Sequence, residues 1–224
     1  MKPWKRRMWC IQRIDSEYRK RMYDLLELYS KKGKQLHIIA IDEKPKEIHS
    51  DSRKPVPGKP GSPEKCDYEY IRKGKANIFM AVDPKRGKRK TKVTLRRTKK
   101  DFACFIKDIL EEYPKARKLH LVMDNLNTHF PKSVIETFGD IESRKMLSRI
   151  EFHYTPKHAS WLNMAEIEIN VMDTECTGRR FDSKEELERS VKAWERRRNR
   201  KKCRIKWTFT KEKADNKLSK YYTE

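Results

Sequence analysis

The sequence lacks the features of a membrane or secreted protein. No apolar stretch approaches the roughly 18 residues that cross a bilayer, and the basic start MKPWKRRMWC carries no signal-peptide pattern. Its five cysteines, at positions 10, 66, 104, 176 and 203, form no Cys-x-x-Cys pair and show no spacing suited to a zinc site or a disulfide framework. We therefore expect a cytoplasmic chain whose cysteines are reduced and structural.

Negative charge is also scarce relative to positive charge. The chain carries 56 Lys and Arg against 33 Asp and Glu, a formal net charge of +23. This excess is far beyond what solubility requires and predicts a polyanionic partner, with nucleic acid as the first candidate and no membrane. A hydrophobic fraction of 36% with 40% charged residues is close to a disordered composition. The apolar residues are nevertheless concentrated in periodic segments, which predicts a folded basic domain.

Internal repeats are absent, and 224 residues fit one domain of ordinary size or a domain with a short arm. Apolar periodicity within this length predicts alternating helices and strands. In chain order the predicted elements are a helix at 15–32, a strand at 36–41, an extended proline-rich loop at 50–65, a hairpin pairing 77–82 with 92–95, a helix from Thr98 or Asp101 to Glu112, a strand ending at Asp124, a short helix at 131–138, a polar connection, a strand at 150–154, a helix beginning near Trp161, and a helix at 183–198. This order indicates an α/β fold with a mixed central sheet flanked by helices.

Two carboxylates end predicted strands. Asp42 closes the run LHIIAID and Asp124 closes LHLVMD, and both runs have the nearly continuous apolar pattern of a buried strand. A carboxylate in this position lies at the rim of the sheet. Glu43 follows Asp42, but strand alternation turns adjacent side chains to opposite faces, so we leave it out of the predicted site.

A third carboxylate comes from the helix that follows. At helical spacing Asn163, Glu166, Asn170 and Asp173 form one polar stripe, whereas Glu168 points away from it. Glu166 is therefore the predicted partner of the two aspartates. Separated carboxylates of this kind favour hard divalent cations such as Mg²⁺, and two ions serve phosphodiester chemistry. The alternative is that each acid only caps or solvates the end of its own element.

Several segments around these residues match one known family. They are IIAIDEKP at 38–45, DYEYIRKGKANIFMAV at 67–82, LVMDNLNTH at 121–129, TPKHASWLNMAEIEI at 155–169, the tail WERRRNRKKCRIKWTFTKEKADNKL at 194–218, and KPWKRRMWC near the start. Together they span most of the chain. The sequence resembles the DDE transposases of the mariner superfamily, specifically their bacterial insertion-sequence branch.

The resemblance implies an RNase H-like catalytic domain at 35–182, preceded by a linker and helix at 1–34 and followed by a basic C-terminal helix and tail at 183–224. It implies that Asp42, Asp124 and Glu166 are the metal-binding triad, loaded with two Mg²⁺ ions or with Mn²⁺ as a substitute. It further implies metal-dependent cleavage at transposon ends, strand transfer into target DNA, and a homodimer on double-stranded DNA in a bacterial cytoplasm.

Two departures from the family pattern leave alternatives open. The family normally carries an N-terminal helix-turn-helix region, and this sequence begins where that region should end. The alternatives are a downstream reading frame joined to a helix-turn-helix partner by frameshifting, a truncated copy and an excised catalytic domain, and a separate helix-turn-helix protein is a further candidate partner. The 41 residues between Asp124 and Glu166 exceed the commonest spacing, with 139–149 as the expected insertion. The alternative functions are a DNA nuclease without strand transfer and a catalytically inactive DNA-binding remnant or assembly subunit.

Further residues are candidates for supporting and DNA-binding roles. Asn125 and His129 match the family pattern DNLNTH and are expected to steady Asp124 or touch DNA, and Asn163 is a third supporting candidate; a local loop hydrogen bond is the alternative. Basic clusters lie at Lys5–Arg7, Lys85–Lys92 and Arg196–Lys202, and binding through them should weaken steeply with salt. The named DNA-contact candidates are Lys85, Arg86, Lys88, Arg89, Lys157, His158, Arg196, Arg197, Arg198 and Arg200.

Overall fold

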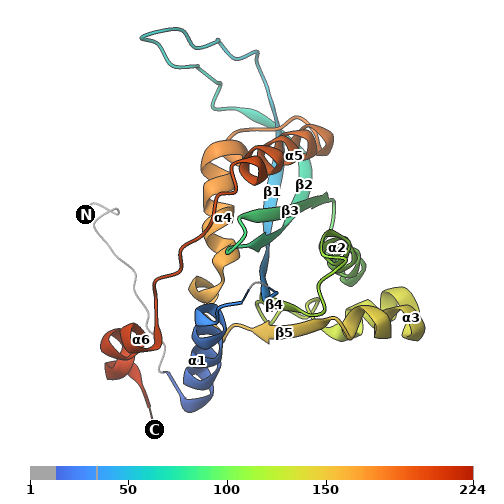
Figure 1. The fold of residues 1–224 in the computed structure, drawn as a ribbon. Coiled ribbons are helices and arrows are strands. Elements are labelled where there is room, and N and C mark those ends of the chain that lie inside the picture. Colours follow the sequence, from blue (N-terminus) through green and yellow to red (C-terminus); the bar gives the residue numbers. More distant parts are fainter. Residues whose placement is uncertain (1–13, 34, 224) are drawn as a thin grey trace.

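A five-stranded sheet forms the centre of the molecule. The computed structural model describes residues 14–33 and 35–223 (Figure 1). The strands are β1 (His37–Asp51), β2 (Tyr70–Asp83), β3 (Lys88–Thr94), β4 (Leu119–Met123) and β5 (Ile150–Tyr154), in the spatial order β3-β2-β1-β4-β5. The pairs β1–β2 and β2–β3 are antiparallel, whereas β1–β4 and β4–β5 are parallel. The predicted mixed sheet is confirmed.

Helices cover both faces of this sheet. They are α1 (Ser16–Ser30), α2 (Lys99–Glu112), α3 (Pro131–Leu147), α4 (Met164–Met172), α5 (Lys184–Arg200) and α6 (Lys211–Leu218), with short 3₁₀ turns at Ser160–Leu162 and Ser219–Tyr221 and a π turn at Asp173–Thr177. The start of α2 is fixed by a capping box between Thr98 and Asp101, and Thr98 is one of the two predicted caps. The side chain of Ser183 caps α5 in the same way that Asp15 caps α1.

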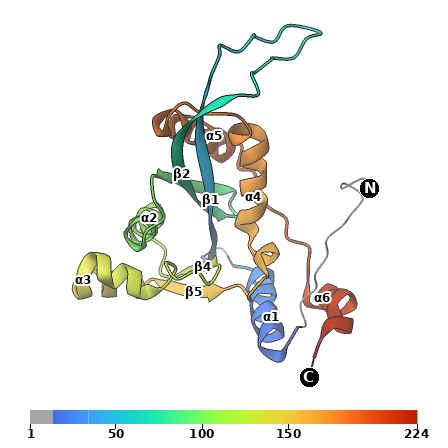
Figure 2. The same cartoon turned by 180° about the vertical axis from the view of Figure 1, so that it is seen from behind.

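Strand alternation in β1 assigns each side chain to one face. Ile39 and Ile41 pack in the core formed with α2 and α3, and Ile38 and Ala40 pack against α1 and the start of α4. A third apolar cluster, centred on Trp194, fixes α5 over β2 and β3. Views from opposite sides show α2 and α3 on one side of the sheet, with α1 and α4 on the other (Figures 1 and 2).

The first two strands are longer than the apolar runs predict. Beyond the core, β1 and β2 remain paired as far as Asp51 and Tyr70, with a register irregularity between Ile48 and His49. Residues 52–69 then form an arm that projects away from the body, with isolated bridges at Val56–Lys65 and Lys59–Ser62 (Figures 1 and 2). A continuous apolar run marks only the part of a strand that is buried on both faces, so it does not predict this exposed ladder.

Helix α3 corrects the predicted polar connection after residue 138. The chain stays helical to Leu147, with a kink at Gly139, where φ is 74° and ψ is 173°. A residue with positive φ normally ends a helix, which explains why the sequence pattern stops there. The second half buries only Ser143 and Met146, so its apolar period is too weak to be recognised. The helix α6 was not predicted.

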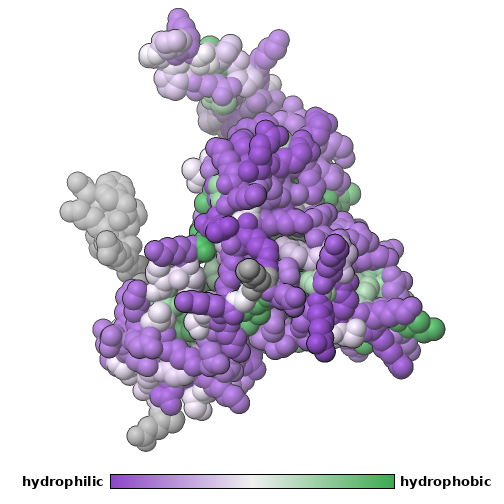
Figure 3. Space-filling view, in the orientation of Figure 1, coloured by the Kyte–Doolittle hydropathy of each residue, from purple (hydrophilic) through white to green (hydrophobic). Residues whose placement is uncertain are grey.

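The surface seen in Figure 3 is mostly hydrophilic, as the composition requires. Within residues 14–33 and 35–223, no helix is both long enough and apolar enough to cross a membrane. The basic cluster Lys5–Arg7 and the N-terminal segment that carries part of the family resemblance lie outside the described residues.

Candidate active site

The parallel pairing of β1 with β4 brings the two aspartates to the same level of the sheet, where β4 ends. The prediction that Asp42 ends its strand is wrong, because β1 continues to Asp51 through its pairing with β2. Ala40 is paired with Val122, and Asp42 and Asp124 each lie two residues further along. The Asp42 side chain accepts hydrogen bonds from the Glu43 N–H at 2.8 Å and from Asn163 Nδ2 at 3.3 Å. The Asp124 side chain remains 36% exposed. One aspartate is therefore held from several sides, whereas the other opens toward solvent.

Asn163 joins the helix that carries Glu166 to the middle of β1. Its side chain is buried and donates to the Ile41 carbonyl at 2.8 Å as well as to Asp42. The same side chain caps α4 by accepting from the Ala165 N–H at 3.1 Å. Glu166 lies in the first turn of α4, and its N–H donates to the Asn163 carbonyl at 3.1 Å. One amide thus fixes the position of the third acid relative to the first.

Electrostatic repulsion links the three predicted acids. Burial raises the pKa of Asp42 to about 7, opposed by the hydrogen bond from the Glu43 N–H and reinforced by the charges of Glu166, Asp124 and Glu43. Carboxylate oxygens are the preferred donors of Mg²⁺ and Mn²⁺, and a divalent ion among them would relieve this repulsion. The residues present therefore fit such an ion.

The triad is more open than a compact single-ion site. Among the described residues, donor atoms within 4.8 Å of one another occur in the sets Glu43, Asp124, His129 and His120, Glu151, His153, and not in Asp42, Asp124 and Glu166. Two ions roughly 3.5 to 4 Å apart need a wider spread of carboxylates than one ion does.

His129 lies buried between two carboxylates. Its Nε2 is 2.6 Å from Glu43 Oε1, and its Nδ1 is 2.6 Å from Asp124 Oδ1 and 3.3 Å from the Asp124 carbonyl. The ring of Phe102 packs on it with centroids 4.7 Å apart. Burial by itself lowers the pKa of His129, but the hydrogen bonds to Asp124 and Glu43 outweigh burial and raise the pKa to about 9. At neutral pH the ring is an imidazolium that holds one oxygen of Asp124 in place.

Glu43 is the supporting residue that sequence reasoning missed. Strand alternation correctly placed it on the face opposite Asp42, among residues packed on α2 and α3. The loop after β4 then folds His129 back onto it, a contact over 86 positions that strand periodicity cannot reveal. The signal available in the sequence was the His five residues after Asp124, which places a cation within one loop of the acid.

The remaining supporting and loop candidates lie at the surface. Asn125 is exposed in the loop after β4. Lys157 and His158 are exposed in the turn that precedes α4, where His158 has a φ of 61°.

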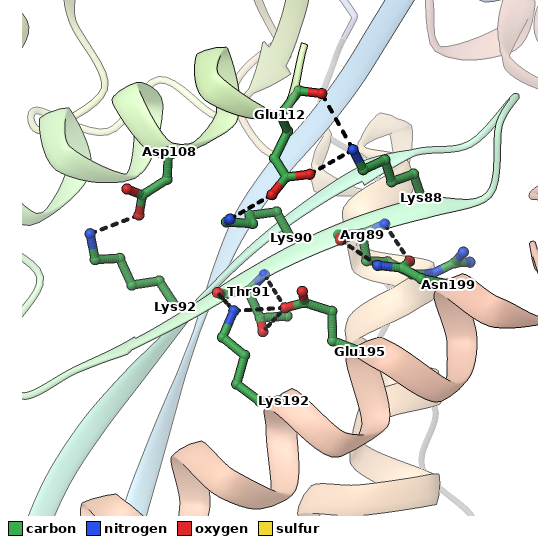
Figure 4. Close-up of polar contacts among 10 residues, drawn as sticks. All are labelled: Lys88, Arg89, Lys90, Thr91, Lys92, Asp108, Glu112, Lys192, Glu195 and Asn199. Carbon is green, nitrogen blue, oxygen red and sulfur yellow. Dashed lines mark hydrogen bonds and ion pairs between the residues drawn. The ribbon is translucent and has the colours of Figure 1, made fainter. Parts of the chain in front are cut away.

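The basic hairpin differs from the expected cationic tip, because acids of neighbouring helices pair with its side chains. Lys88 and Lys90 contact the Glu112 carboxylate at 2.6 and 2.7 Å, and Lys92 contacts Asp108 at 2.8 Å (Figure 4). Both acids lie on α2. In the turn itself, Lys85 donates to the Lys31 carbonyl and Arg86 donates to Asp83 and to the Leu36 carbonyl.

Arg89 corrects the expectation of an exposed cation at the hairpin. Its side chain is 0% exposed and donates to both oxygens of Glu168 at 2.8 Å. Arg198 donates to the same carboxylate at 2.9 Å. Glu168 points away from the predicted stripe, as helical spacing indicates, but it is a buried anchor of α4 and not a solvated residue.

The end of α5 retains more exposed charge. Arg196 and Arg200 are exposed, whereas Arg197 contacts Glu175 at 3.4 Å and Arg198 is largely buried against Glu168. The surface formed by Arg196, Arg200, Lys201 and Lys202, here called the α5 basic end, is the more accessible of the two described basic regions.

Comparison with known proteins assigns the family. Residues 37–188 match the model of the DDE superfamily endonucleases, a region that includes Asp42, Asp124 and Glu166. The chain belongs to this family. A search of curated proteins found no match.

Solved structures of Mos1 transposase share the fold of this DDE endonuclease domain. The Mos1 strand transfer complex matches with a TM-score of 0.60 at 15% identity, over 98% of this chain and 66% of that one. The catalytic domain of Mos1 mariner transposase matches with a TM-score of 0.59 at 12% identity, over 96% and 100%. The Mos1 paired-end complex with the left transposon end matches with a TM-score of 0.56 at 15% identity, over 89% and 63%. The RNase H-like fold is confirmed, and the chain spans about two thirds of the Mos1 chains found in the DNA complexes.

Proposed function

We propose that this chain is the catalytic domain of a transposase that cleaves DNA at transposon ends and joins the ends to target DNA. The observation that carries the proposal is that Asp42 on β1 lies level with Asp124, just past the end of the parallel strand β4, with Asn163 linking Asp42 to the first turn of α4 that carries Glu166, inside the matched DDE region. The motif likeness supports placing it in the bacterial insertion-sequence branch of the mariner superfamily. The fold shared with a strand transfer complex supports the second chemical step.

The three acids would hold two Mg²⁺ ions, with Mn²⁺ as a substitute. When bound, such ions activate an attacking oxygen and stabilise a leaving oxygen in an in-line phosphoryl transfer. The protein's own contribution is positioning. Asn163 fixes Asp42 relative to the start of α4, and His129 holds one oxygen of Asp124 and leaves the other available to a ligand.

Double-stranded DNA would be the partner of the exposed basic surface of the domain. The α5 basic end and Lys157 offer exposed cations, and phosphate contacts of this kind give affinity without sequence information. Transposon ends are paired before transfer, so the proposal includes a homodimer on DNA, in the cytoplasm where bacterial DNA lies. A helix-turn-helix protein or fusion partner would supply recognition of the ends.

A strand-transfer assay tests the function. The full chain is incubated with Mn²⁺, a pre-nicked transposon-end duplex and supercoiled plasmid, beside Asp42→Asn, Asp124→Asn and Glu166→Gln. Asp140→Asn, an exposed acid on α3, is the matched control. Joined products that are lost in the three triad variants and kept in the control are the expected result.

Two other outcomes contradict the proposal in different ways. Triad-dependent nicks without joined products would establish the nuclease alternative. Binding to DNA without nicking or joining, even when the helix-turn-helix region is supplied in trans, would establish a catalytically inactive DNA-binding remnant.

A further inference from the structure

A second group of metal-ligating side chains lies on the edge of the sheet away from the carboxylate triad. His120 is on β4, and Glu151 and His153 are on β5, the last strand of the sheet. His120 is paired with Glu151, and His153 is paired with Val122, so the three side chains share one face. That face is the one packed against α1, because Val122 belongs to the cluster formed with that helix. Asp124 follows the opposite end of β4, roughly 13 Å further along the strand.

The donor atoms lie close to the spacing of a tetrahedral site. His120 Nδ1 lies 3.0 Å from His153 Nε2 and 3.6 Å from Glu151 Oε2, and His153 Nε2 lies 3.3 Å from Glu151 Oε1. With Zn–N and Zn–O distances of about 2.0 to 2.1 Å, the ligand atoms of a tetrahedral zinc ion are about 3.3 Å apart. The two N–O separations run to different oxygens of Glu151, and one ligand atom from each of the three residues lies within 4.8 Å of the others, so a small rotation of the exposed carboxylate brings a single oxygen to the third position.

The chemistry of the group selects the class of ion. Two imidazoles and one carboxylate suit Zn²⁺ and similar transition metals, whereas Mg²⁺ prefers oxygen donors alone. The ammonium groups of Lys31 and Lys118 and the carboxylate of Asp24 are near enough to act on these histidines. The positive charges of the two lysines repel a bound cation. An ion therefore binds only if its affinity for imidazole outweighs this repulsion.

Burial is also suited to a bound ion. The two imidazoles are each 19% exposed and are held by the paired strands, whereas Glu151 is 50% exposed. A ligand set of three protein donors with one accessible side leaves the fourth tetrahedral position to water. The rings are therefore already placed, and little side-chain freedom remains to be lost on binding.

We propose that His120, Glu151 and His153 form a binding site for one zinc-class transition-metal ion, separate from the Asp42, Asp124, Glu166 triad. The ion links the edge strand β5, which is five residues long, to β4. Because it binds the folded arrangement, it stabilises the domain against unfolding. Without the ion, the same nitrogens form a hydrogen bond between the two neutral rings.

The test uses Co²⁺ as a visible probe on tag-free protein, in excess Mg²⁺ so that the oxygen-donor triad is occupied. We expect one Co²⁺ per chain with the intense absorption of tetrahedral coordination, displaced by one equivalent of Zn²⁺. His120→Ala or His153→Ala should abolish the band, and Glu151→Gln should weaken binding by at least about 10-fold. Because Glu151 is half exposed, its substitution tests the site without disturbing the core.

Two controls separate this site from the rest of the molecule. His49→Ala removes a histidine that also lies beside a glutamate, Glu47 at 3.1 Å, and should leave the band unchanged. Asp42→Asn removes a triad ligand and should also leave it unchanged. A missing band in the wild-type protein, a band that survives the loss of either His120 or His153, or a band lost with Asp42 would overturn the proposal. Zn²⁺ should also raise the melting temperature of the wild type and of Asp42→Asn, but not that of Glu151→Gln to the same extent.

Discussion

Two clusters of three charged residues, each with a buried centre, mirror each other in sign. In the site cluster, the His129 cation lies between the carboxylates of Glu43 and Asp124. In the scaffold cluster, the Glu168 carboxylate lies between the guanidinium groups of Arg89 and Arg198. Each cluster carries one uncompensated charge when its members are ionised.

The clusters differ in how completely their charged groups are shielded from solvent. Arg89 and Glu168 are 0% and 1% exposed, and the second arginine is further balanced by Glu175 at 3.6 Å. In the site cluster the central ring is buried, but Asp124 is 36% exposed. A closed cluster can only hold elements together, whereas an open one directs a carboxylate toward a ligand. The same type of interaction thus serves architecture at one place and chemistry at the other.

The largest expected effect comes from breaking the scaffold cluster. Glu168→Gln leaves two arginines without their shared carboxylate, and an uncompensated buried charge costs about 3–5 kcal/mol. That is a large fraction of the stability of an ordinary domain. Urea denaturation followed by circular dichroism measures the loss. Glu188→Gln, which breaks the surface pair with Lys184, should cost under about 1 kcal/mol.

A double substitution that removes both charges of one pair shows whether the loss of stability comes from unbalanced charge or from lost packing. Replacing both partners, Arg89→Met with Glu168→Met, should recover much of the stability, because apolar groups of similar size often replace a buried pair without loss. If the double variant is as unstable as Glu168→Gln, the charge-balance explanation of this cluster is wrong.

The next largest effect is expected in the site cluster, on its affinity for metal ions. His129→Gln removes the group that holds Asp124, and loss of such a supporting contact typically weakens metal binding by about 10- to 100-fold. Calorimetric titration with Mn²⁺ measures it. The double variant Glu43→Gln with His129→Gln removes the buried charges together and should regain stability without regaining metal affinity. Recovery of affinity along with stability would show that His129 acts only on the fold.

A smaller effect concerns the charges outside both clusters. Removing two exposed cations of the α5 basic end, Arg196→Ala with Arg200→Ala, should lower the salt dependence of DNA binding by about 2 in the slope of log K against log salt. Lys88→Ala with Lys90→Ala should change the slope little, because Glu112 already pairs with both lysines. Fluorescence anisotropy across a salt series compares the two variants. Equal changes in slope would mean that the pairing with Glu112 does not survive on DNA.

The side-by-side placement of the two aspartates was predictable from the sequence for a local reason, although β1 continues past Asp42 to Asp51. Asp42 and Asp124 each close an apolar run, and parallel pairing of buried strands brings such ends together. The separate placement of Glu168 was predictable because helical spacing turns it away from Glu166 on one helix. These inferences need only the periodicity of apolar and polar residues, which can be recognised within one short segment of the sequence.

The clusters themselves depend on contacts between distant segments. Arg89 and Glu168 are 79 positions apart, and His129 and Glu43 are 86 apart, so composition showed their charges but not their partners. The same limit explains why the hairpin lysines had the pattern of a free cationic surface, although α2 supplies their acids. The exposed ladder beyond Asp42 and the second half of α3 were missed because neither buries a continuous or periodic apolar face.

The smallest effect belongs to a partly exposed counterpart of the scaffold cluster, in which Glu112 lies between Lys88 and Lys90. The hydrogen bonds from Lys88 and then Lys90 hold the pKa of Glu112 at about 2, below its usual 4.5. A carboxyl whose folded pKa is lowered adds stability above its unfolded pKa, and this stability is lost as pH falls from 4.5 through about 2. Solvent screening limits the contribution to about 0.5–1 kcal/mol.

Glu112→Gln should therefore be less stable than wild type by this amount above pH 5, and the difference should shrink to nothing near pH 2. Urea denaturation at several pH values measures it, with the exposed neighbour substitution Glu111→Gln as the matched control. Raising the salt to about 1 M should also reduce the difference, because screened surface pairs weaken while closed ones do not. If the stability difference between wild type and Glu112→Gln persists at low pH and at high salt, Glu112 behaves like the buried charges of the scaffold cluster. Exposure to solvent would then not be what separates weak ion pairs from strong ones.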